Sequence, residues 1–374
     1  MTMTRSSERS WNKSDRIALR IARTLRAGAF TKILPAAFCA VALANPASAQ
    51  TVTLPQDEAP HSDTVEWFYF VGNLQGADSK GKKHSYGYQM TMFQVVEVPQ
   101  QPAVYVTNVA ITDLTNSIYH TGSATTSTNI PSEYDGFSLS ANTWQMQGSS
   151  GTYSVNAQMT DQSYALALNM QSTIPAALHG TNGQIPYGPY GTSAYYSYTS
   201  LPTVGTVIDH GTPVSVTGLS WQDHQWGNFT LGAQIGWTWF GIQVASSFPV
   251  TTNIQYMLYF IQDSTGAYVQ TVATQVVNGV TSALPTNAVS QTPLTYWKSP
   301  TTGYTYPTSW KVTVPGGSLT VKSLLQNQEF VGAPGYRTYY EGDSSVSGTV
   351  NGLPVSGGAF AEVNPYFQSG QLAP

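Results

Sequence analysis

An aspartate and a histidine are neighbours at positions 223 and 224, within the segment SWQDHQWGNF, in a chain of which only 9% of the residues are charged. A carboxyl group and an imidazole can supply a proton and a base, and the flanking indoles of Trp221 and Trp226 would shift both pKa values by excluding water. An equally good interpretation is a buried pair that hydrogen-bonds across a turn and only holds structure. Asp223 and His224 are therefore candidate catalytic residues with a structural alternative.

Glu66, in the segment TVEWFYFVGNL, presents the same choice. In an alternating strand Glu66, Phe68 and Phe70 share one face, and the residues between them share the other. The carboxyl group is then either an acid in a ligand pocket or the partner of a buried cation, because buried charges are normally paired. Arg337, the only arginine after residue 49, is the natural cation for Glu66 or Glu341.

Aromatic residues gather in sequence around these polar positions. They are Trp226, Trp237, Trp239, Tyr86, Tyr88, Tyr195, Tyr196 and Tyr198. Most aromatic side chains fill cores or line barrels. Indole and phenol faces also stabilise a developing carbocation, by up to ~2 kcal/mol each when water is excluded. The same rings would hold an apolar or sugar-like ligand without any reaction.

Several familiar sites are missing from the sequence. There is no G-x-S-x-G nucleophile motif and no P-loop, and the six histidines lack the HExxH spacing. A metal at His61 and Asp63, or at Asp223 and His224, is conceivable, but neighbouring residues of a strand face opposite ways. We expect neither a metal nor any other cofactor.

The first 49 residues differ in composition from the rest. They contain eight of the 15 basic residues and two of the 19 acidic ones, followed by an apolar run over 33–44 and the sequence Ala47-Ser48-Ala49. A basic start, a short apolar run and small residues before a cleavage point are typical of a secretory signal peptide. The run is too short to cross a bilayer. We expect cleavage after Ala49 and a secreted or periplasmic protein.

The remaining chain is anionic and contains no cysteine. It keeps seven of the 15 basic and 17 of the 19 acidic residues, a formal net charge of −10, and Cys39 lies before the cleavage point. Such a chain is a poor partner for nucleic acid, which needs neutralising charge. It must be stabilised by burial rather than by disulfides. We expect a small apolar partner, no nucleic acid and no stable membrane insertion; the oligomeric state is not written in the sequence.

After residue 50 the apolar pattern has a period of two. Segments rich in Val, Tyr, Thr and Trp alternate with turn signals at Asp135-Gly136, Asn278-Gly279, Pro315-Gly316-Gly317 and Asn351-Gly352. This predicts an all-β fold. The length favours two consecutive β domains, 50–222 and 223–374, so that the Asp223 motif lies where the domains meet.

Ten segments occur in the order of a known family. They are HSDTVEWFYFVGNL, YGYQMTMF, AITD, YYSYTSL, WQDHQWGNF, GWTWFGIQV, PTSWKVTVP, LLQNQEF, YYEG and SGTVNGLPVSGGAFAEV. With them the chain, from about His61 to Tyr366, resembles the family of carotenoid 1,2-hydratase (hydroxyneurosporene synthase) and the AttH-type secreted lipocalin-like proteins.

The resemblance implies two lipocalin-like antiparallel β-barrels in tandem and cofactor-free hydration of a prenyl-type double bond. The chain departs from the family pattern at five positions. Phe68 and Tyr340 replace tryptophans, Asn108 stands at a frequent histidine, Thr238 at an acidic position and Gln94 at a frequent arginine. The changes at Asn108 and Thr238 would remove protonatable groups from the pocket.

The predicted function is that of a hydro-lyase acting on an apolar isoprenoid or related alkene. Asp223, alone or with His224, would protonate the double bond, and a water positioned by His224 or Glu66 would capture the cation. The predicted substrate-binding residues are Trp226, Trp239, Tyr88, Gln89, Tyr69, Gln243 and Tyr196. Two alternatives remain open: a secreted carrier of a lipid or terpenoid without chemistry, and a terpenoid cyclase on the same scaffold. A glycan-active hydrolase ranks last, because no nucleophile or carboxylate pair is recognisable.

Overall fold

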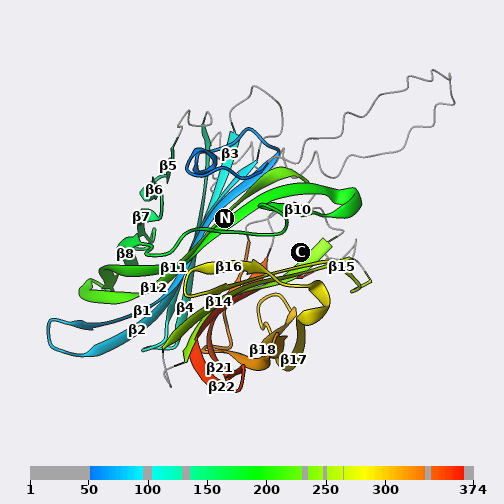
Figure 1. The fold of residues 1–374 in the computed structure, drawn as a ribbon. Coiled ribbons are helices and arrows are strands. Elements are labelled where there is room, and N and C mark those ends of the chain that lie inside the picture. The colour runs from blue at the N-terminus through cyan, green and yellow to red at the C-terminus, as the bar shows by residue number, and fades with distance from the viewer. Residues whose placement is uncertain are drawn as a thin grey trace, which may run out of the picture. The chain divides into compact units, whose positions relative to one another are not determined.

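The structure is a computed structural model that describes residues 51–95, 103–128, 135–229, 235–246, 251–263, 265–332 and 338–365. The predicted signal peptide lies outside the described residues, as do Cys39 and Arg337. The described residues are almost entirely strands and connecting turns (Figure 1). Their only helical elements are single 3₁₀ turns: η1 (Gln56–Glu58), η2 (Gly188–Tyr190) and η3 (Thr286–Ala288). The predicted all-β class is confirmed.

The first twelve strands form one antiparallel sheet, with the hydrogen-bonded order β4-β3-β2-β1-β12-β11-β8-β7-β6-β5 and with β9 and β10 paired to β11. Pairing of β1 with β12 joins the first strand of this sheet to its last. The strands are β1 (Val65–Asp78), β2 (Lys83–Val95), β3 (Ala103–Asp113), β4 (Ile118–Thr128), β5 (Phe137–Ala141), β6 (Trp144–Ser149), β7 (Thr152–Gln158), β8 (Tyr164–Gln171), β9 (Ala177–Leu178), β10 (Gln184–Pro186), β11 (Gly191–Asp209) and β12 (Thr212–Phe229).

The other ten strands form a second antiparallel sheet, ordered β16-β15-β14-β13-β22-β21-β19-β18-β17, with β20 paired to β21. Here too the first strand, β13, pairs with the last, β22. The strands are β13 (Ile235–Ser246), β14 (Thr252–Asp263), β15 (Tyr268–Val277), β16 (Val280–Ala283), β17 (Ser290–Lys298), β18 (Thr305–Val314), β19 (Gly317–Ser323), β20 (Glu329–Phe330), β21 (Tyr339–Val350) and β22 (Leu353–Asn364).

Three of the four predicted turns connect strands as expected. Asn278-Gly279 joins β15 to β16 and Asn351-Gly352 joins β21 to β22, each with positive φ at both residues, which two-residue hairpins of type I′ require. Gly316, with φ 75°, closes the turn between β18 and β19. Asp135-Gly136 instead precedes β5 and joins no two described strands.

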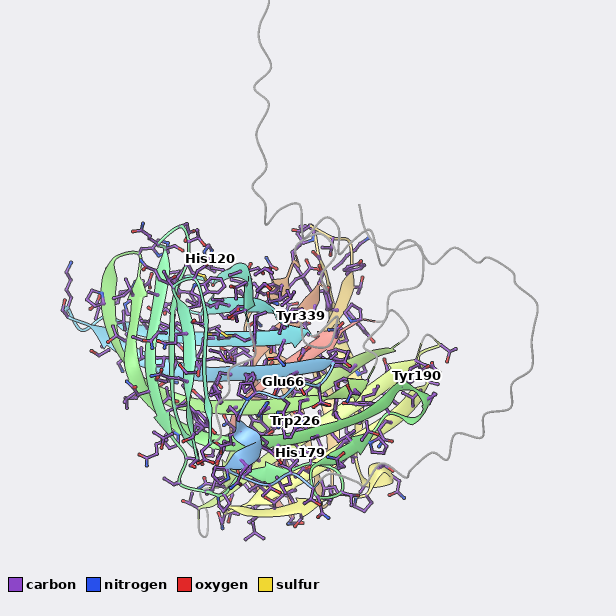
Figure 2. The ribbon with its side chains drawn as sticks, turned by 90° about the horizontal axis from the view of Figure 1, so that it is seen from above. Glu66, His120, His179, Tyr190, Trp226 and Tyr339 are labelled. Carbon is purple, nitrogen blue, oxygen red and sulfur yellow. The ribbon has the colours of Figure 1, made fainter. Side chains whose placement is uncertain are left out.

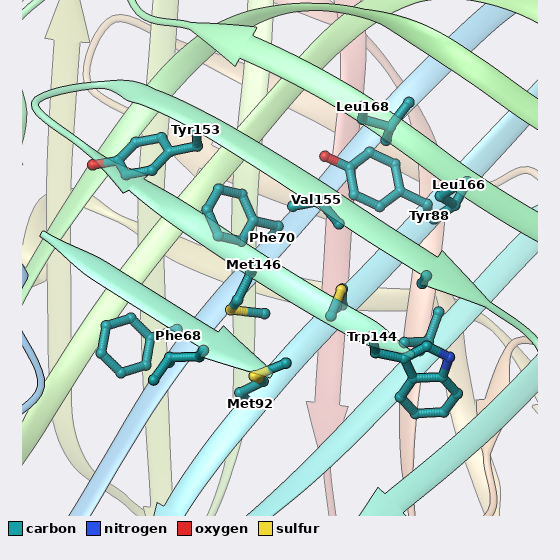
Figure 3. Packing of buried hydrophobic residues seen from close by; sticks show 14 of the residues in the cluster. Phe68, Phe70, Tyr88, Met92, Trp144, Met146, Tyr153, Val155, Leu166 and Leu168 are labelled. Atoms are coloured by element: carbon teal, nitrogen blue, oxygen red, sulfur yellow. The ribbon is translucent and has the colours of Figure 1, made fainter. Parts of the chain in front are cut away.

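The first sheet curls around a core of its own. Short strands such as β5 alternate cleanly, with Phe137, Leu139 and Ala141 buried and the serines between them exposed. Aromatic and aliphatic side chains from all parts of the sheet meet inside (Figure 3). Strand β4 closes against β6, since a Cβ placed on Gly122 would lie 3.1 Å from the Trp144 ring. The first sheet is therefore nearly a closed barrel.

The second sheet also surrounds its own core, and a third cluster lies between the sheets. The second core centres on Trp310 and Phe240. The cluster between the sheets joins Tyr69, Tyr195 and Trp221 of the first sheet to Trp239 and other side chains of the second. Strands β1 and β12 are consequently buried on both faces in their central parts, which removes the alternation of polar and apolar residues there.

The predicted boundary between residues 222 and 223 is wrong in position. Asp223 lies inside β12, and the chain passes from the first sheet to the second between Phe229 and Ile235. The reason is that SWQDHQWGNF continues an extended strand instead of breaking it. The division into two independent domains stays a prediction. None of the described residues belongs to a helix with the length and hydropathy of a membrane span.

Candidate active site

The side chains of Asp223 and His224 point to opposite faces of β12. Asp223 is paired with Tyr69 of β1, and both belong to the face that packs on the second sheet. His224 is paired with Phe68, whose ring stacks on the imidazole at 4.1 Å inside the first sheet. The structure therefore separates two residues that the sequence suggested as one acid–base pair, because the side chains of a strand alternate.

The face with Asp223 borders a pocket between the two sheets. The first sheet contributes Trp67, Tyr69, Gln89, Thr91, Phe93, Tyr195, Asp223 and Gln225, and the second contributes Trp237, Trp239, Tyr259, Tyr339 and Glu362. Among these residues there are two carboxyl groups and no Lys, Arg or His. The cavity has a volume of about 40 Å³, room for roughly two or three water molecules.

Asp223 is held by three hydrogen-bond donors. The Tyr195 hydroxyl and the Trp221 indole N–H each donate at 2.6 Å, to Oδ2 and Oδ1 respectively, and the Ser197 hydroxyl also donates to Oδ1. The side chain is 3% exposed. Burial raises the pKa of Asp223 to about 7, although the three donors favour the carboxylate. Near neutral pH this group is a carboxylic acid in a substantial fraction of molecules.

A second proton-bearing group lies close to this pocket. Glu341 and Glu362 are directly opposite on β21 and β22, so their side chains share one face. Burial, and then the charge of Glu362, raise the pKa of Glu341 well above its usual value. The Glu341 carboxyl accepts a hydrogen bond of 2.8 Å from Tyr69, and Glu362 accepts one of 3.0 Å from Trp237. Burial and the neighbouring carboxyl group thus favour the protonated form of Glu341.

A chain of hydrogen bonds leads from Asp223 across the first sheet's outer face. Ser197, which bonds Asp223, lies 2.6 Å from His179 Nε2, and His179 Nδ1 lies 2.9 Å from the Thr274 hydroxyl of the second sheet. Burial lowers the pKa of His179 to about 3, so this imidazole is neutral. His179 therefore orients Ser197 and joins the two sheets without adding charge.

On the other face of β12, inside the first sheet, Glu66 binds two imidazoles. His224 Nε2 lies 2.6 Å and His61 Nδ1 2.8 Å from the same oxygen, Oε1. The other oxygen accepts hydrogen bonds from the His61 backbone N–H at 2.9 Å and from the Gln94 amide at 3.0 Å. Glu66 and Trp226 are opposite each other in the pairing of β1 with β12, and both are labelled in Figure 2. The His61 ring stacks on Trp226 at 4.1 Å.

The partners of Glu66 decide its charge. Burial opposes ionisation, but the hydrogen bonds with His224 and His61 hold the pKa of Glu66 below its usual value. Despite burial, the contacts with Asp57 and Glu66 raise the pKa of His61 to about 9. Burial lowers the pKa of His224. The suggested partner, Arg337, lies outside the described residues; the cation beside Glu66 is His61.

The predicted binding residues divide between the two sites. Tyr69, Gln89 and Trp239 line the pocket with Asp223. Trp226, Tyr196 and Tyr88 lie inside the first sheet, where Tyr196 contacts His224 Nδ1 at 3.2 Å and Tyr88 donates to Ser220 at 2.8 Å. Gln243 borders a separate groove between the sheets, where its amide donates to the backbone oxygens of Thr199 and Ser220.

The structure adds site residues that sequence reasoning did not assign. Tyr195 bridges Asp223 and Trp239, whose indole donates to the Tyr195 hydroxyl at 3.0 Å. Glu362 and Tyr339 belong to the pocket, and Tyr339 accepts from Gln89 at 2.8 Å. Because side chains alternate along a strand, Tyr195 lies on the same face of β11 as Ser197, the partner of Asp223 on β12. The sequence could have identified Tyr195 once this pairing was known. No local pattern indicates that β21 and β22 deliver Tyr339 and Glu362 to the same place.

Comparison with known proteins places the chain in a family. The AttH-like family model matches residues 45–366. The chain belongs to the AttH-like family. Kievitone hydratase of Fusarium solani subsp. phaseoli is 27% identical over 232 residues, which span 58% of this chain and 63% of that enzyme. The match thus covers less than two thirds of the curated relative.

Two solved structures share the fold. A crystal structure assigned as an AttH protein of Nitrosomonas europaea aligns with a TM-score of 0.69 and 22% identity, over 86% of this chain and 98% of the other. The crystal structure of kievitone hydratase from Nectria haematococca aligns with a TM-score of 0.63 and 20% identity, over 85% and 94%. At these identities the two structures show the fold alone; the family rests on the family model.

Proposed function

We propose that this protein is a hydratase that adds water to a carbon–carbon double bond of an apolar isoprenoid or related alkene, in the pocket between the sheets. The observation that carries the proposal is a buried carboxyl group, Asp223, with a pKa of about 7 on an aromatic pocket. Protonation of an isolated alkene needs an acid that still holds its proton at working pH. Similarity to a kievitone hydratase supports the same reaction class.

The hydrogen bonds of Asp223 indicate which oxygen carries the proton. The Trp221 indole can only donate, so Oδ1 is an acceptor in both protonation states. The Tyr195 hydroxyl, which faces Oδ2, can both donate and accept. The proton therefore belongs on Oδ2, next to a tyrosine that lines the pocket with Asp223.

In the forward reaction Asp223 Oδ2 gives its proton to one alkene carbon, and the π electrons form the new C–H bond. The other carbon becomes a carbocation, and Asp223 becomes a carboxylate stabilised by Tyr195, Ser197 and Trp221. The faces of Trp239, Trp237 and the neighbouring rings stabilise the cation. A water oxygen then adds to it and loses a proton to the Glu362 carboxylate; Glu362 releases that proton to solvent, and solvent returns one to Asp223.

This assignment differs from the sequence-based mechanism in the group that handles water. His224 and Glu66 were expected to position the water, but they lie on the other face of β12 from Asp223. Glu362 lines the same pocket as Asp223, and its charge adds to burial in raising the pKa of Glu341. Glu362 is therefore the group that accepts the proton of the attacking water.

The test is incubation of the purified protein with a panel of isoprenoid and prenylated alkenes in H₂¹⁸O, followed by mass spectrometry. The expected product carries one ¹⁸O and the mass of one added water, and D223N forms none of it. The control is D343N, because Asp343 is also buried with a pKa raised to about 7 but does not line the pocket. Ligand that binds and is recovered unchanged would indicate the alternative, a carrier without chemistry.

We also propose that residues 1–49 direct export and are then removed. Residues 1–49 have the composition of a secretory signal, and cleavage is expected after Ala49. Intact-mass measurement of protein from the periplasm or medium of its host tests this directly. A mature chain that begins at Gln50 supports it, and retention of residues 1–49 in the cytoplasm would overturn it.

A further inference from the structure

Three ligand-type side chains converge inside the first sheet, away from the Asp223 pocket. They come from the segment before β1 (His61), from β1 (Glu66) and from β12 (His224). One ligand atom of each, His61 Nδ1, Glu66 Oε1 and His224 Nε2, lies within 4.8 Å of the other two. Glu66 and His224 are fully buried, and the His61 side chain is 16% exposed. The three donor atoms form a triangle, and the His61 corner of it is partly exposed to solvent.

We propose that this triad is a binding site for a divalent transition-metal ion of the Zn²⁺ type. Two imidazoles and one carboxylate are a frequent donor set for zinc, and also for iron(II) and related ions. With neutral imidazoles the ligands bring one negative charge, so a divalent ion leaves a site of charge about +1. The carboxylate of Asp57, 3.7 Å from His61 Nε2, balances this remainder.

The outer atoms of all three ligands are already oriented. His61 directs Nε2 to Asp57, a carboxylate–histidine contact of the kind that accompanies metal-binding imidazoles. His224 directs Nδ1 to the Tyr196 hydroxyl at 3.2 Å, and that hydroxyl serves either tautomer. Each ligand thereby keeps one atom pointing at the shared centre.

Glu66 is oriented in the same way. Its Oε2 is held by the His61 backbone N–H and by the uncharged Gln94 amide, which leaves Oε1 for the ion. Because Gln94 carries no charge, it does not compete with a cation for the carboxylate. The ring of Phe68 on one side of His224 and that of Trp226 on His61 restrict rotation of both imidazoles.

The movement needed to admit an ion is small. A tetrahedral site with bonds of ~2.0–2.1 Å places its ligand atoms ~3.3 Å apart. The two N–O distances here are 2.8 and 2.6 Å, so they must lengthen by about 0.5 and 0.7 Å. The protons now shared on Glu66 Oε1 are released as the ion binds. The partly exposed side of His61 supplies the path for the ion and for a water ligand.

The experiment loads the full chain with Zn²⁺, removes excess by dialysis against chelator-free buffer, and measures bound zinc by elemental analysis. Co²⁺ provides a second readout through its visible d–d absorption. Wild type is expected to retain one equivalent and to show a zinc-dependent rise in Tm. H61A, in the partly exposed segment before β1, and E66Q are expected to lose more than ~100-fold in affinity, whereas Y196F, which alters only an outer contact, loses about 10- to 100-fold.

Two controls separate this site from the surface and from the catalytic proposal. H210A removes an exposed histidine that also contacts an aspartate, Asp209, and should bind zinc like wild type. D223N should bind zinc normally because Asp223 faces the other way. Substoichiometric zinc in wild type, or equal zinc in wild type and H61A, would overturn the proposal and leave a proton-bridged His–Glu–His cluster. Circular dichroism of each variant confirms that lost binding is not lost fold.

Discussion

The two faces of β12 stabilise a buried carboxyl group in opposite charge states. Each face buries a carboxyl group almost completely, Glu66 at 0% and Asp223 at 3% exposure. Glu66 has two imidazoles on one oxygen and a lowered pKa, whereas Asp223 has only hydroxyls and an indole and a pKa of about 7. Burial alone therefore does not decide whether a carboxyl group is charged. Hydrogen bonds from neutral donors offset only part of the free-energy cost of burying an ionised carboxylate. A nearby cation offsets the rest.

Replacing the acid of the neutral face should have the largest effect. D223N keeps the size of the side chain but has no transferable proton, so kcat/KM for hydration is expected to fall by at least about 10²- to 10⁴-fold. Steady-state kinetics with the substrate found in the ¹⁸O screen measures this. D343N serves as the matched variant, because it removes a second buried carboxyl of similar pKa outside the pocket. Equal losses in the two variants would show that the effect is structural.

Replacing the acid of the charged face should act on stability instead. E66Q removes the fully buried carboxylate that contacts both imidazoles and leaves the His61 cation with Asp57 alone, at 3.7 Å, so it is expected to lower the free energy of unfolding by about 3–5 kcal/mol. Urea denaturation of metal-free protein measures the loss. The comparison variant is E329Q, since Glu329 is buried but bonded to hydroxyls of Ser299, Thr302 and Tyr306. Its cost is expected at about 1–3 kcal/mol; a cost equal to that of E66Q would contradict the role given to the cation.

The pH dependence of stability distinguishes the faces without any substrate. The pKa of the Asp223 carboxyl group rises from its usual value of 3.8 to about 7 in the folded protein. The stability that its neutral form contributes is complete below about pH 4 and is lost as pH rises through 7, at up to ~1.4 kcal/mol per pH unit. D223N lacks this loss. The difference in unfolding free energy between wild type and D223N should therefore shift against wild type from pH 4 to pH 8, and a constant difference would refute the raised pKa.

The smallest effect is expected from the tyrosine that bridges Asp223 and Trp239. Y195F removes a donor that stabilises the carboxylate left after proton transfer, so the rate should fall by roughly tenfold, the equivalent of one hydrogen bond to a charged group. The pKa of Asp223 should rise further, and the high-pH limit of activity should move upward. Y187F is the control, because the Tyr187 hydroxyl contacts Ser193 and Gln225 but not Asp223. A downward shift of the pH limit in Y195F would contradict the hydrogen-bond direction.

Much of the fold follows from the sequence, because its signals are local. Alternation identified the strands, and Asn278-Gly279 and Asn351-Gly352 identified hairpins, since positive φ at two successive residues suits few other sequences. Alternation also predicted correctly that Glu66 and Phe68 share a face. The domain boundary failed because β12 is buried on both sides, so the polar–apolar pattern that marks a strand's end is weak there.

The site was only partly predictable, for a related reason. Asp223, Tyr69, Gln89 and Trp239 line one pocket, whereas His224 and Glu66, which were grouped with them, lie on the other side of the sheet formed by β1 and β12. Glu362 depends on the long-range pairing of β13 with β22, which no local signal reveals. The stacking of His61 on Trp226 likewise joins positions 165 residues apart.

The central claim, that Asp223 is a neutral acid near physiological pH, can be measured without knowing the substrate. The side-chain carboxyl carbons of ¹³C-aspartate-labelled protein are titrated by NMR from about pH 3 to about pH 9, and the signal absent from D223N is assigned to Asp223. The account predicts a midpoint near pH 7. A midpoint near the ordinary value of 3.8 would show a carboxylate that has no proton to give, and would contradict the account.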